Sequence, residues 1–324
     1  MRPRDAALAG ACVVLLAPAG LLTFLRLTEP PWARAVQAVA FTPYALPLYA
    51  ATLILVAGVM VARRTVAVPY AATAGLAVTG LVVHAWWFAP QLTGNVPAAA
   101  PDAEPTVVMT TNVLRGRADV AGLMDQVRDR DVDLLVVNEI TDSSLAAMEA
   151  AGLKTLLPFR EGRPGVDDAV AGTMVFSSES TELVDSLDTA LDSLVVETAR
   201  LRLFAVHPSS PVSPETWRDD HATILTAVED RRPDLVVGDF NATLDHAPMR
   251  ALEDAGYHDS VELTNGGFQP TWPVDGPFGP IGFLGPVAQI DHVLVSDDWA
   301  VTATETTELD GSDHKPVIAT VAAR

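Results

Sequence analysis

The segment DLVVGDFN (residues 234–241) shows the pattern that decides the fold of the carboxyl-terminal two thirds of the chain. Its centre, 235–238, is apolar apart from a glycine, which is typical of a strand buried on both faces. The run then stops at Asp239 and Asn241. An Asp-x-Asn sequence after a strand is more often a turn than a ligand pair, so this segment alone predicts a buried strand followed by a polar turn.

The same pattern of apolar strands recurs on both sides of this segment. The other expected strands cover residues 106–114, 133–140, 169–177, 193–199, 200–207, 287–296 and 314–321. Helical periodicity and capping residues predict helices over 118–130, 143–152 and 213–230. Strands mixed with helices over roughly 220 residues predict an α/β (α+β) domain in which helices cover sheets.

The amino-terminal third has a different composition and predicts a membrane anchor. Three uncharged apolar runs cover residues 6–25, 35–62 and 65–88. Each reaches the roughly 20 residues that are needed to cross a bilayer. The first run is too long for a cleavable signal peptide, and two more follow it. We therefore expect three transmembrane helices in residues 1–89, joined by a flexible Pro- and Ala-rich linker, 90–105, to a domain over 106–324.

The distribution of basic residues predicts how these helices cross the membrane. Arg2 and Arg4 precede the first run, and Arg63 and Arg64 lie between the second and the third. Loops rich in Lys and Arg favour the cytoplasmic side, although the opposite loop also holds two Arg. Three crossings from a cytoplasmic start make the chain a multi-pass cell-membrane protein whose carboxyl-terminal domain is extracytoplasmic.

Charge and cysteine content limit the partners of this domain. Residues 1–98 contain six Arg and two acidic residues, whereas the remainder contains 15 basic and 39 acidic residues. Such an acidic domain repels polyanions at long range, which disfavours nucleic acid unless a bound divalent metal reverses the local charge. The single cysteine, Cys12, rules out a disulfide framework or a cysteine-based zinc site.

Polar side chains of a particular kind gather at the ends of the expected strands. They are Asn112, Glu139, His207, Asp239, Asn241, Asp291, Asp313 and His314. Each one alone has an ordinary explanation as a cap, a turn or a surface residue. Together they suggest one site, because carboxylates and amide oxygens are ligands for Mg²⁺ or Mn²⁺, and an adjacent carboxylate and imidazole suit the activation of water.

In this order the segments TTNVL, VVNEI, VHP, VVGDFNAT, IDHVLV and GSDHKPV resemble the endonuclease/exonuclease/phosphatase family. The family includes pancreatic-type deoxyribonucleases, apurinic endonucleases, neutral sphingomyelinases and inositol polyphosphate phosphatases. The resemblance covers about residues 105–323. It implies a four-layer αββα sandwich of two mixed β-sheets and metal-dependent hydrolysis of phosphoesters.

The resemblance also implies roles for the residues that match the family motifs. Glu139 would hold the divalent metal with help from Asn112, and Asp313 of the closing motif would join them. Asp239 and Asn241 would align the attacking water and the phosphate group.

The remaining implied roles concern two histidines. His314 would act as general base or transition-state donor, with Asp291 orienting its ring. His207 would contact or protonate the phosphate group, as in the deoxyribonuclease and sphingomyelinase branches. Deoxyribonuclease-type members pair this histidine with an acid, for which Glu161, Asp167 and Asp168 are candidates here.

Other aromatic residues and histidines are given less weight. Trp272, in the long Gly- and Pro-rich loop 264–286, either stacks on a substrate or packs the loop. Trp217 is expected in the core or on a docking face, and His292 is expected to be structural because it alternates with Asp291 along a strand. We expect three further histidines at the surface, namely His221, His246 and His258.

These observations favour a membrane-anchored Mg²⁺- or Mn²⁺-dependent phosphoesterase. Its substrate would be a phospholipid, a small phosphodiester or nucleic acid, and its other partner would be the lipid bilayer; no protein partner is inferred. The alternatives are a nuclease that acts on DNA or RNA outside the membrane and a non-catalytic binding domain on the same fold. A transporter is disfavoured, because the centres of the apolar runs carry no ionisable residue of the kind that lines an ion pathway.

Overall fold

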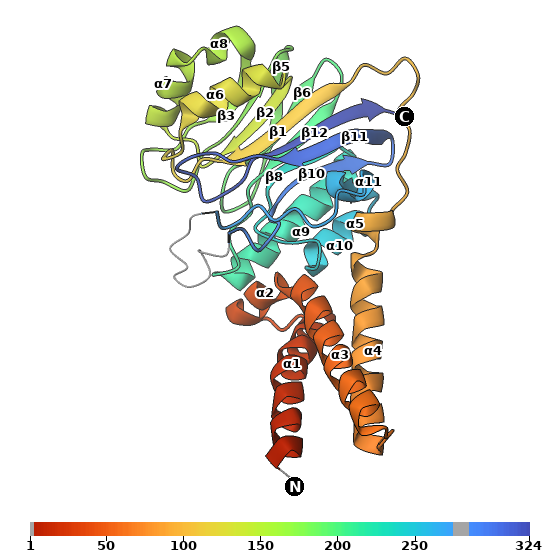
Figure 1. Ribbon diagram of the computed structural model, residues 1–324. Coiled ribbons are helices and arrows are strands. Elements are labelled where there is room, and N and C mark those ends of the chain that lie inside the picture. Colours follow the sequence, from red (N-terminus) through yellow and green to blue (C-terminus); the bar gives the residue numbers. More distant parts are fainter. Residues whose placement is uncertain (1–2, 275–284) are drawn as a thin grey trace. The chain divides into compact units, whose positions relative to one another are not determined.

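The computed structural model describes residues 3–274 and 285–324 (Figure 1). The chain divides into two compact units, Met1–Pro90 and Gln91–Arg324. The first is made of helices and the second contains all the strands that the structure describes.

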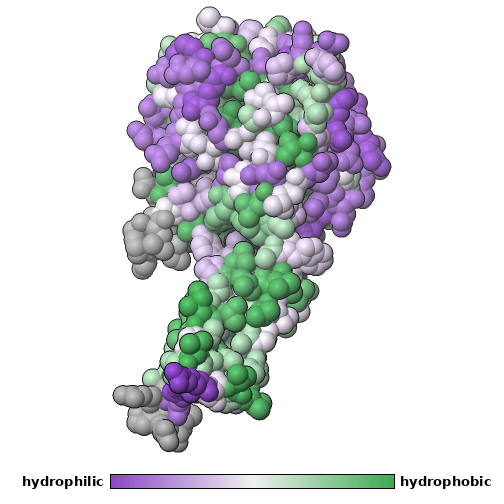
Figure 2. Space-filling view, turned by 45° about the vertical axis from the view of Figure 1, so that its right-hand side comes forward, coloured by the Kyte–Doolittle hydropathy of each residue, from purple (hydrophilic) through white to green (hydrophobic). Residues whose placement is uncertain are grey.

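The amino-terminal unit contains three long apolar helices. Its elements are α1 (Pro3–Thr28), α2 (Ala33–Val39), the 3-10 turn η1 (Thr42–Tyr44), α3 (Ala45–Arg63) and α4 (Val68–Phe88). Three segments are long and apolar enough to cross a membrane: Asp5–Thr28, Thr42–Arg63 and Val68–Phe88. The surface over these helices is largely hydrophobic (Figure 2). The second apolar run, 35–62, is interrupted by Pro43 and Pro47: α2 ends at Val39, η1 contains Pro43, and α3 contains Pro47.

A buried polar contact joins the three long helices. The Thr23 hydroxyl of α1 lies 2.8 Å from the Tyr49 hydroxyl of α3 and 2.9 Å from Nε2 of His84 in α4. The Tyr49 ring packs against Gly80, where a Cβ would approach it to 2.3 Å. Because the Thr23 hydroxyl reaches both other side chains, this contact links α1, α3 and α4 at one point along their length.

The carboxyl-terminal unit is a sandwich of two six-stranded sheets. The first has the order β11-β12-β1-β2-β4-β3 and consists of β1 (Thr106–Asn112), β2 (Leu134–Asn138), β3 (Phe159–Arg163), β4 (Thr173–Ser177), β11 (Trp299–Thr306) and β12 (Val317–Ala323). The second has the order β5-β6-β7-β8-β10-β9 and consists of β5 (Thr181–Leu187), β6 (Ser193–Thr198), β7 (Arg202–Val206), β8 (Leu235–Asp239), β9 (Tyr257–Asp259) and β10 (Asp291–Ser296). In each sheet a parallel pair, β1 with β2 or β7 with β8, has antiparallel neighbours. The predicted sandwich of two mixed sheets is thus confirmed.

Helices cover the outer faces of the sandwich (Figure 1). They are α6 (Val120–Asp129), α7 (Asp142–Ala150), α8 (Leu153–Leu156), α9 (Pro214–Arg231), α10 (Ala247–Asp254) and α11 (Ser260–Leu263). In α6 the buried residues Val120, Leu123, Met124 and Val127 recur at helical spacing and pack on the first sheet. Strands β3, β5, β9 and β11 were not predicted. In β5 the reason is plain, because this edge strand exposes most of its residues and has no apolar run.

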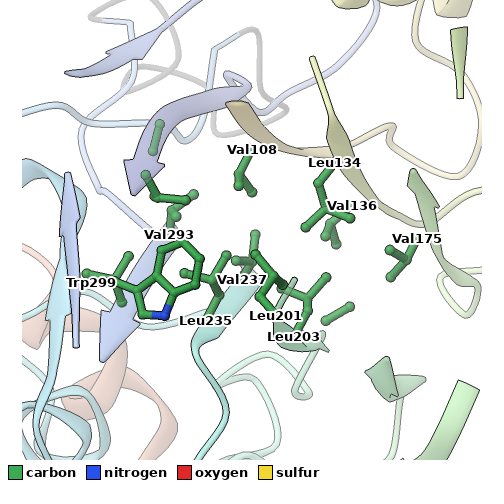
Figure 3. Close-up of a cluster of buried hydrophobic side chains, with 14 of the residues drawn as sticks. Val108, Leu134, Val136, Val175, Leu201, Leu203, Leu235, Val237, Val293 and Trp299 are labelled. Carbon is green, nitrogen blue, oxygen red and sulfur yellow. The ribbon is translucent and has the colours of Figure 1, made fainter. Parts of the chain in front are cut away.

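The main core lies between the two sheets (Figure 3). Buried aliphatic side chains of the first sheet, such as Val136 and Val175, face those of the second, such as Val237 and Val293. Burying one such side chain stabilises the fold by about 1.5–3 kcal/mol. This apolar layer holds the sheets in one alignment, which brings the ends of strands from both sheets to one edge.

The segment predicted as a flexible linker contains the short helix α5 (Pro90–Thr93). Within the carboxyl-terminal unit, the Gln91 carbonyl accepts a hydrogen bond from the Gly267 amide at 2.8 Å. The Ala100 amide donates to the Ala323 carbonyl at 2.9 Å. The segment is therefore bonded to the rest of the carboxyl-terminal unit at Gln91 and at Ala100.

Candidate active site

The sheet topology explains why residues that are far apart in sequence meet at one edge. Strands β1 and β2 are parallel, so Asn112 and Glu139 leave the first sheet on the same side. Strand β12 runs antiparallel to β1, with Val317 opposite Thr110, so the residues just before β12 reach that side too. In the second sheet the pairing of β8 with β10 places Asp239 directly opposite Asp291.

Asn112 connects the two sheets at this edge. Its side-chain amide Nδ2 donates to Glu139 Oε1 at 3.1 Å and to Asp239 Oδ2 at 3.0 Å. Its Oδ1 accepts from the Leu114 amide at 2.9 Å, which fixes the orientation of the carboxamide. The other Glu139 oxygen, Oε2, accepts from the Arg115 amide at 2.9 Å. These contacts bring three of the predicted site residues into one cluster.

His314 lies between several carboxylates. Its Nδ1 is 2.8 Å from Asp291 Oδ2, as expected for an acid that orients the ring. Its Nε2 is 3.7 Å from Asp239 Oδ2 and 3.8 Å from Asp313 Oδ1, so it faces both acids without a close hydrogen bond. The Ser312 hydroxyl donates to the Asn112 carbonyl at 2.7 Å and accepts from the His314 amide at 3.0 Å, which connects this segment to β1.

The turn after β8 holds Asn241 beside Asp239. The Asn241 amide donates to Asp239 Oδ1 at 2.8 Å, and its side-chain Nδ2 donates to the Pro208 carbonyl at 3.1 Å. Asn241 adopts a positive φ of 49°, and Glu139 one of 56°. Non-glycine residues are uncommon in this left-handed region, so the backbone at both positions is held by its surroundings.

His207 is brought to the same cluster, but without the expected acid. Its Nε2 lies 3.7 Å from Asp239 Oδ2, and within the described residues its buried Nδ1 has no hydrogen-bond partner. The three candidate acids bond elsewhere: Asp167 accepts from the Ser143 amide, Asp168 pairs with Arg117, and Glu161 accepts from the Thr181 hydroxyl. The expectation that one of them partners this histidine finds no support in the described contacts.

Trp272 contacts an acid of the cluster. Its indole Nε1 donates to Asp313 Oδ2 at 3.1 Å, and its ring centroid lies 6.5 Å from that of His314. The adjacent loop backbone pairs with the same segment, because the Val274 amide donates to the Asp313 carbonyl and the Lys315 amide to the Thr271 carbonyl. Residues 275–284 of the predicted loop lie outside the described residues.

Burial and mutual charge shift the protonation equilibria of the cluster. Burial raises the pKa of Glu139 and of Asp239 above their ordinary values. Burial also lowers the pKa of His207, which favours the neutral imidazole. It would likewise lower the pKa of His314, but the carboxylates of Asp291 and Asp239 outweigh it and raise that pKa to about 10.

The donor set fits a divalent cation. One ligand atom from each of Asp239, Asp291 and His314 lies within 4.8 Å of the others, and Glu139 is connected to them through Asn112. Within the described residues, the buried Asp291 Oδ1 and Asp313 Oδ1 have no hydrogen-bond partner. Buried carboxylate oxygens without partners are costly unless a cation or a donor satisfies them. An oxygen-rich set of this kind suits Mg²⁺ or Mn²⁺.

Several supporting residues were missed or misplaced by the sequence analysis. Asn138 was not singled out, yet its carboxamide accepts from the Asp239 amide at 3.1 Å and donates to the Val206 carbonyl at 3.3 Å, across the two sheets. A polar residue inside the apolar run LLVVN was the available signal. The prediction that His221 and His246 are surface residues was wrong, because both are buried beside Trp217. Amphipathic α9 turns His221 inward, which a single histidine in a charged helix does not reveal.

The fold and the cluster define a hydrolase of the phosphoester-cleaving class, and the comparison with protein families gives the family. The model of the Endonuclease/Exonuclease/phosphatase family matches residues 109–314. The chain belongs to this family. No curated protein matches the chain.

Solved structures show the same fold. A 3′ phosphatase, NExo, from Neisseria bound to a product DNA hairpin is 18% identical, with a TM-score of 0.53, and the match covers 66% of this chain and 98% of that one. TDP2 from D. rerio in complex with a single-strand DNA product is 16% identical, with a TM-score of 0.51, and the match covers 67% of this chain and 99% of that one. At these identities the likeness establishes the architecture of the carboxyl-terminal unit.

Proposed function

We propose that this protein is a membrane-anchored, divalent-metal-dependent phosphoesterase. The observation that carries the proposal is the convergence of acidic side chains on Asn112 and His314: Asn112 Nδ2 donates to Glu139 and Asp239, and His314 faces Asp239, Asp291 and Asp313. Three apolar helices provide the anchor. Four Arg lie before the first helix or between the second and third, against two in the other loop, which supports an extracytoplasmic carboxyl-terminal unit.

In this proposal Glu139, Asn112 and Asp313 hold Mg²⁺ or Mn²⁺. The cation supplies charge neutralisation on the non-bridging oxygens of the phosphoester. Glu139 is fixed by the Arg115 amide and Asn112, and Asp313 by the Trp272 indole, so both carboxylates are oriented before substrate binds. Trp272, whose indole N–H contacts Asp313, would affect the substrate mainly through this acid.

The protein groups prepare the attacking water. Asp239 accepts one hydrogen bond from the water, and Asn241 donates its side-chain N–H to the phosphate group. His314 Nε2 takes the proton of the water as the water oxygen bonds to phosphorus, while Asp291 on Nδ1 stabilises the imidazolium that forms. The P–O bond to the leaving alcohol breaks, solvent water gives that oxygen its proton, and the imidazolium then releases its own proton to solvent. Neutralising the surrounding carboxylates lowers the pKa of His314, because those charges are what raise it.

His207 contributes a neutral hydrogen-bond donor in this proposal. Its Nε2 and that of His314 lie at the same distance, 3.7 Å, from Asp239 Oδ2. Burial lowers the pKa of His207 despite the nearby Asp239 carboxylate, which supports a neutral ring. Such a ring stabilises developing charge on a phosphate oxygen without having to give up a proton.

A small or lipid phosphoester is the substrate class that we propose. The carboxyl-terminal region carries 39 acidic and 15 basic residues, which opposes the binding of a long polyanion. The anchor would keep the site near membrane lipids. Nucleic acid is the second candidate, and its hydrolysis would show that local cations overcome the repulsion.

The test uses the full chain in lipid nanodiscs, with Mg²⁺ or Mn²⁺ and a panel of substrates. The panel consists of bis(p-nitrophenyl) phosphate, lysophospholipid, sphingomyelin, an inositol phosphate, single-stranded DNA and RNA. We expect hydrolysis that EDTA abolishes and that added Mn²⁺ restores. Matched variants are Glu139→Gln and Asp239→Asn. If chelated protein and both variants cleave a substrate as fast as the untreated wild type, the proposal is wrong; Mn²⁺ binding without any hydrolysis would favour the non-catalytic alternative.

The predicted topology has a separate test. Protease added to intact cells should remove the carboxyl-terminal unit and leave a membrane-embedded fragment of about 90 residues, because the unit boundary lies at Pro90. Protection of the unit in intact cells, with cleavage only after lysis, would place it in the cytoplasm and overturn the proposed orientation.

A further inference from the structure

Three consecutive carbonyl groups behind the active-site turn are each held by the N–H of a buried ring. The Phe240 carbonyl lies 3.0 Å from His221 Nε2, the Asn241 carbonyl accepts from Trp217 Nε1 at 3.0 Å, and the Ala242 carbonyl lies 2.9 Å from His292 Nε2. Trp217 and His221 belong to α9, whereas His292 belongs to β10. We call these three side chains the ring clamp. Two elements on different sides of the turn thus hold its backbone.

Simple hydrogen-bond chemistry fixes the protonation of the ring clamp. A carbonyl oxygen only accepts, so His221 and His292 must both carry their proton on Nε2. His221 is neutral, because burial lowers its pKa to about 3. His292 also holds Asp259, whose Oδ2 lies 2.6 Å from Nδ1, and Asp259 is in turn fixed by the Val261 amide at 2.7 Å.

The clamped turn is the one that carries two of the proposed catalytic groups. Asn241 has a positive φ of 49°, and its amide donates to Asp239 Oδ1 at 2.8 Å. Its side chain reaches the Pro208 carbonyl, next to His207. The three carbonyls of the turn are thus engaged by the ring clamp, whereas the Asn241 amide contacts Asp239 of the cluster.

We propose that Trp217, His221 and His292 are positioning residues for phosphoester hydrolysis. They touch no reacting atom and act by holding the 240–242 backbone in the conformation that aims Asp239 and Asn241. The proposal rests on the proposed function for its effect on rate, but the holding of the turn can be measured independently of any substrate. None of the three residues was expected to serve the site from the sequence.

The sharpest variant is Trp217→Phe, which keeps a buried aromatic ring and removes only the indole N–H. Its matched control is Trp299→Phe. Trp299 is also buried, at 8% exposed against 3% for Trp217, and its Nε1 donates to Asp234 at 2.8 Å. Asp234 precedes β8 at the end opposite Asp239, so the control loses an equivalent hydrogen bond away from the site.

Conservative replacements at the histidines separate positioning from packing. A glutamine amide can place an N–H near the position of an imidazole Nε2, whereas leucine fills similar space without a donor. We therefore expect His221→Gln to keep most of the activity that His221→Leu loses, and the same order for His292→Gln and His292→Leu.

Two readouts decide the matter. For Trp217→Phe we expect kcat to fall by about 10–100-fold with KM changed less than about twofold, because misplacing an aligned group acts on the reacting state. Hydrogen–deuterium exchange of the 238–246 segment should become faster in Trp217→Phe and stay at the wild-type level in Trp299→Phe.

The outcomes against the proposal are equally definite. If Trp217→Phe changes neither kcat nor exchange more than Trp299→Phe does, or if the leucine variants keep full kcat, the ring clamp does not position the turn. If the wild type hydrolyses nothing, the proposed function fails. In that case unchanged exchange in Trp217→Phe overturns the ring clamp as well, whereas faster exchange confirms that it holds the turn.

Discussion

Each face of strand β10 contributes one member of a buried Asp–His pair, and the two pairs differ in what they can do. Asp291 and His292 are consecutive, so their side chains point to opposite faces. On one face Asp291 Oδ2 lies 2.8 Å from Nδ1 of His314, and on the other His292 Nδ1 lies 2.6 Å from Oδ2 of Asp259. All four side chains are buried.

The difference lies in the second nitrogen of each imidazole. His292 Nε2 is 2.9 Å from the Ala242 carbonyl, so both of its nitrogens are engaged. His314 Nε2 faces Asp239 and Asp313 at 3.7 and 3.8 Å, too far for a good hydrogen bond. A saturated pair supports structure, whereas a pair with one nitrogen left facing other carboxylates is able to exchange a proton with a substrate or water. The four predictions below test this contrast.

The largest effect on the rate of hydrolysis is expected from the loss of Nε2 of His314. His314→Gln should lower kcat/KM by about 10³-fold or more, because it removes the proposed general base. His292→Gln keeps an N–H for Ala242 and should stay within about tenfold of wild type. Steady-state hydrolysis of the best substrate measures both. An equal loss of kcat/KM in His314→Gln and His292→Gln would show that the two Asp–His pairs do not differ in function.

The pair of His292 and Asp259, in which both imidazole nitrogens are bonded, should matter most for stability. Asp259→Asn leaves His292 buried without its charge partner and should lower the free energy of unfolding by about 3 kcal/mol. Urea titration of the full chain, followed by tryptophan fluorescence, measures the loss. Asp291→Asn is the matched control on the other face; a larger loss of stability in that variant would reverse the assignment.

The same control variant has its own effect on rate. Asp291→Asn retains an oxygen for His314 Nδ1–H but removes the negative charge, so the imidazolium is less stabilised. We expect kcat to fall by roughly 10²-fold with little change in KM. A variant with wild-type kcat would show that Asp291 merely fills space.

The smallest effect concerns an acid close to the saturated pair. Burial, with Asp259 and Glu253 nearby, raises the pKa of Glu262 from 4.5 to about 8. The pKa of Glu262 is higher in the folded than in the unfolded state, so its protonated form favours the folded state. This contribution to stability is complete below pH 4.5 and is lost as pH rises through 8. Between pH 5 and pH 9 the wild type should lose roughly 1–3 kcal/mol that Glu262→Gln keeps. Identical pH profiles of urea unfolding for the two proteins would contradict this.

Much of the fold was predictable because its signals are local. Buried strands such as β2 and β8 are continuous apolar runs, and α6 has apolar residues at helical spacing. The edge strand β5, with mostly exposed residues, has no such signal and was missed. Pro43 and Pro47 in the second apolar run are visible in the sequence, but only the structure shows that the break falls between α2 and α3.

The site divides in the same way. Asn112, Glu139 and Asp239 stand out in the sequence because each ends an apolar strand. Asn138 and His221 do not, because their importance comes from the Asp239 amide and the Phe240 carbonyl, which belong to distant segments. That the acid facing His207 is Asp239, at 3.7 Å, is equally invisible in the sequence.

The sequence by itself determined the apolar helices, the strands that end in polar residues and the kinds of chemical groups present. These features depend on composition and short-range periodicity. Only the tertiary structure decided which nitrogen faces which oxygen. Asp291 and His292 are adjacent in β10, but their side chains lie on opposite faces. His292 contacts Asp259 of β9, and Asp291 contacts His314 in the segment before β12. Those partners are set by sheet pairing over long separations in the chain, and hydrogen-bond geometry depends on tenths of an ångström that no local pattern encodes.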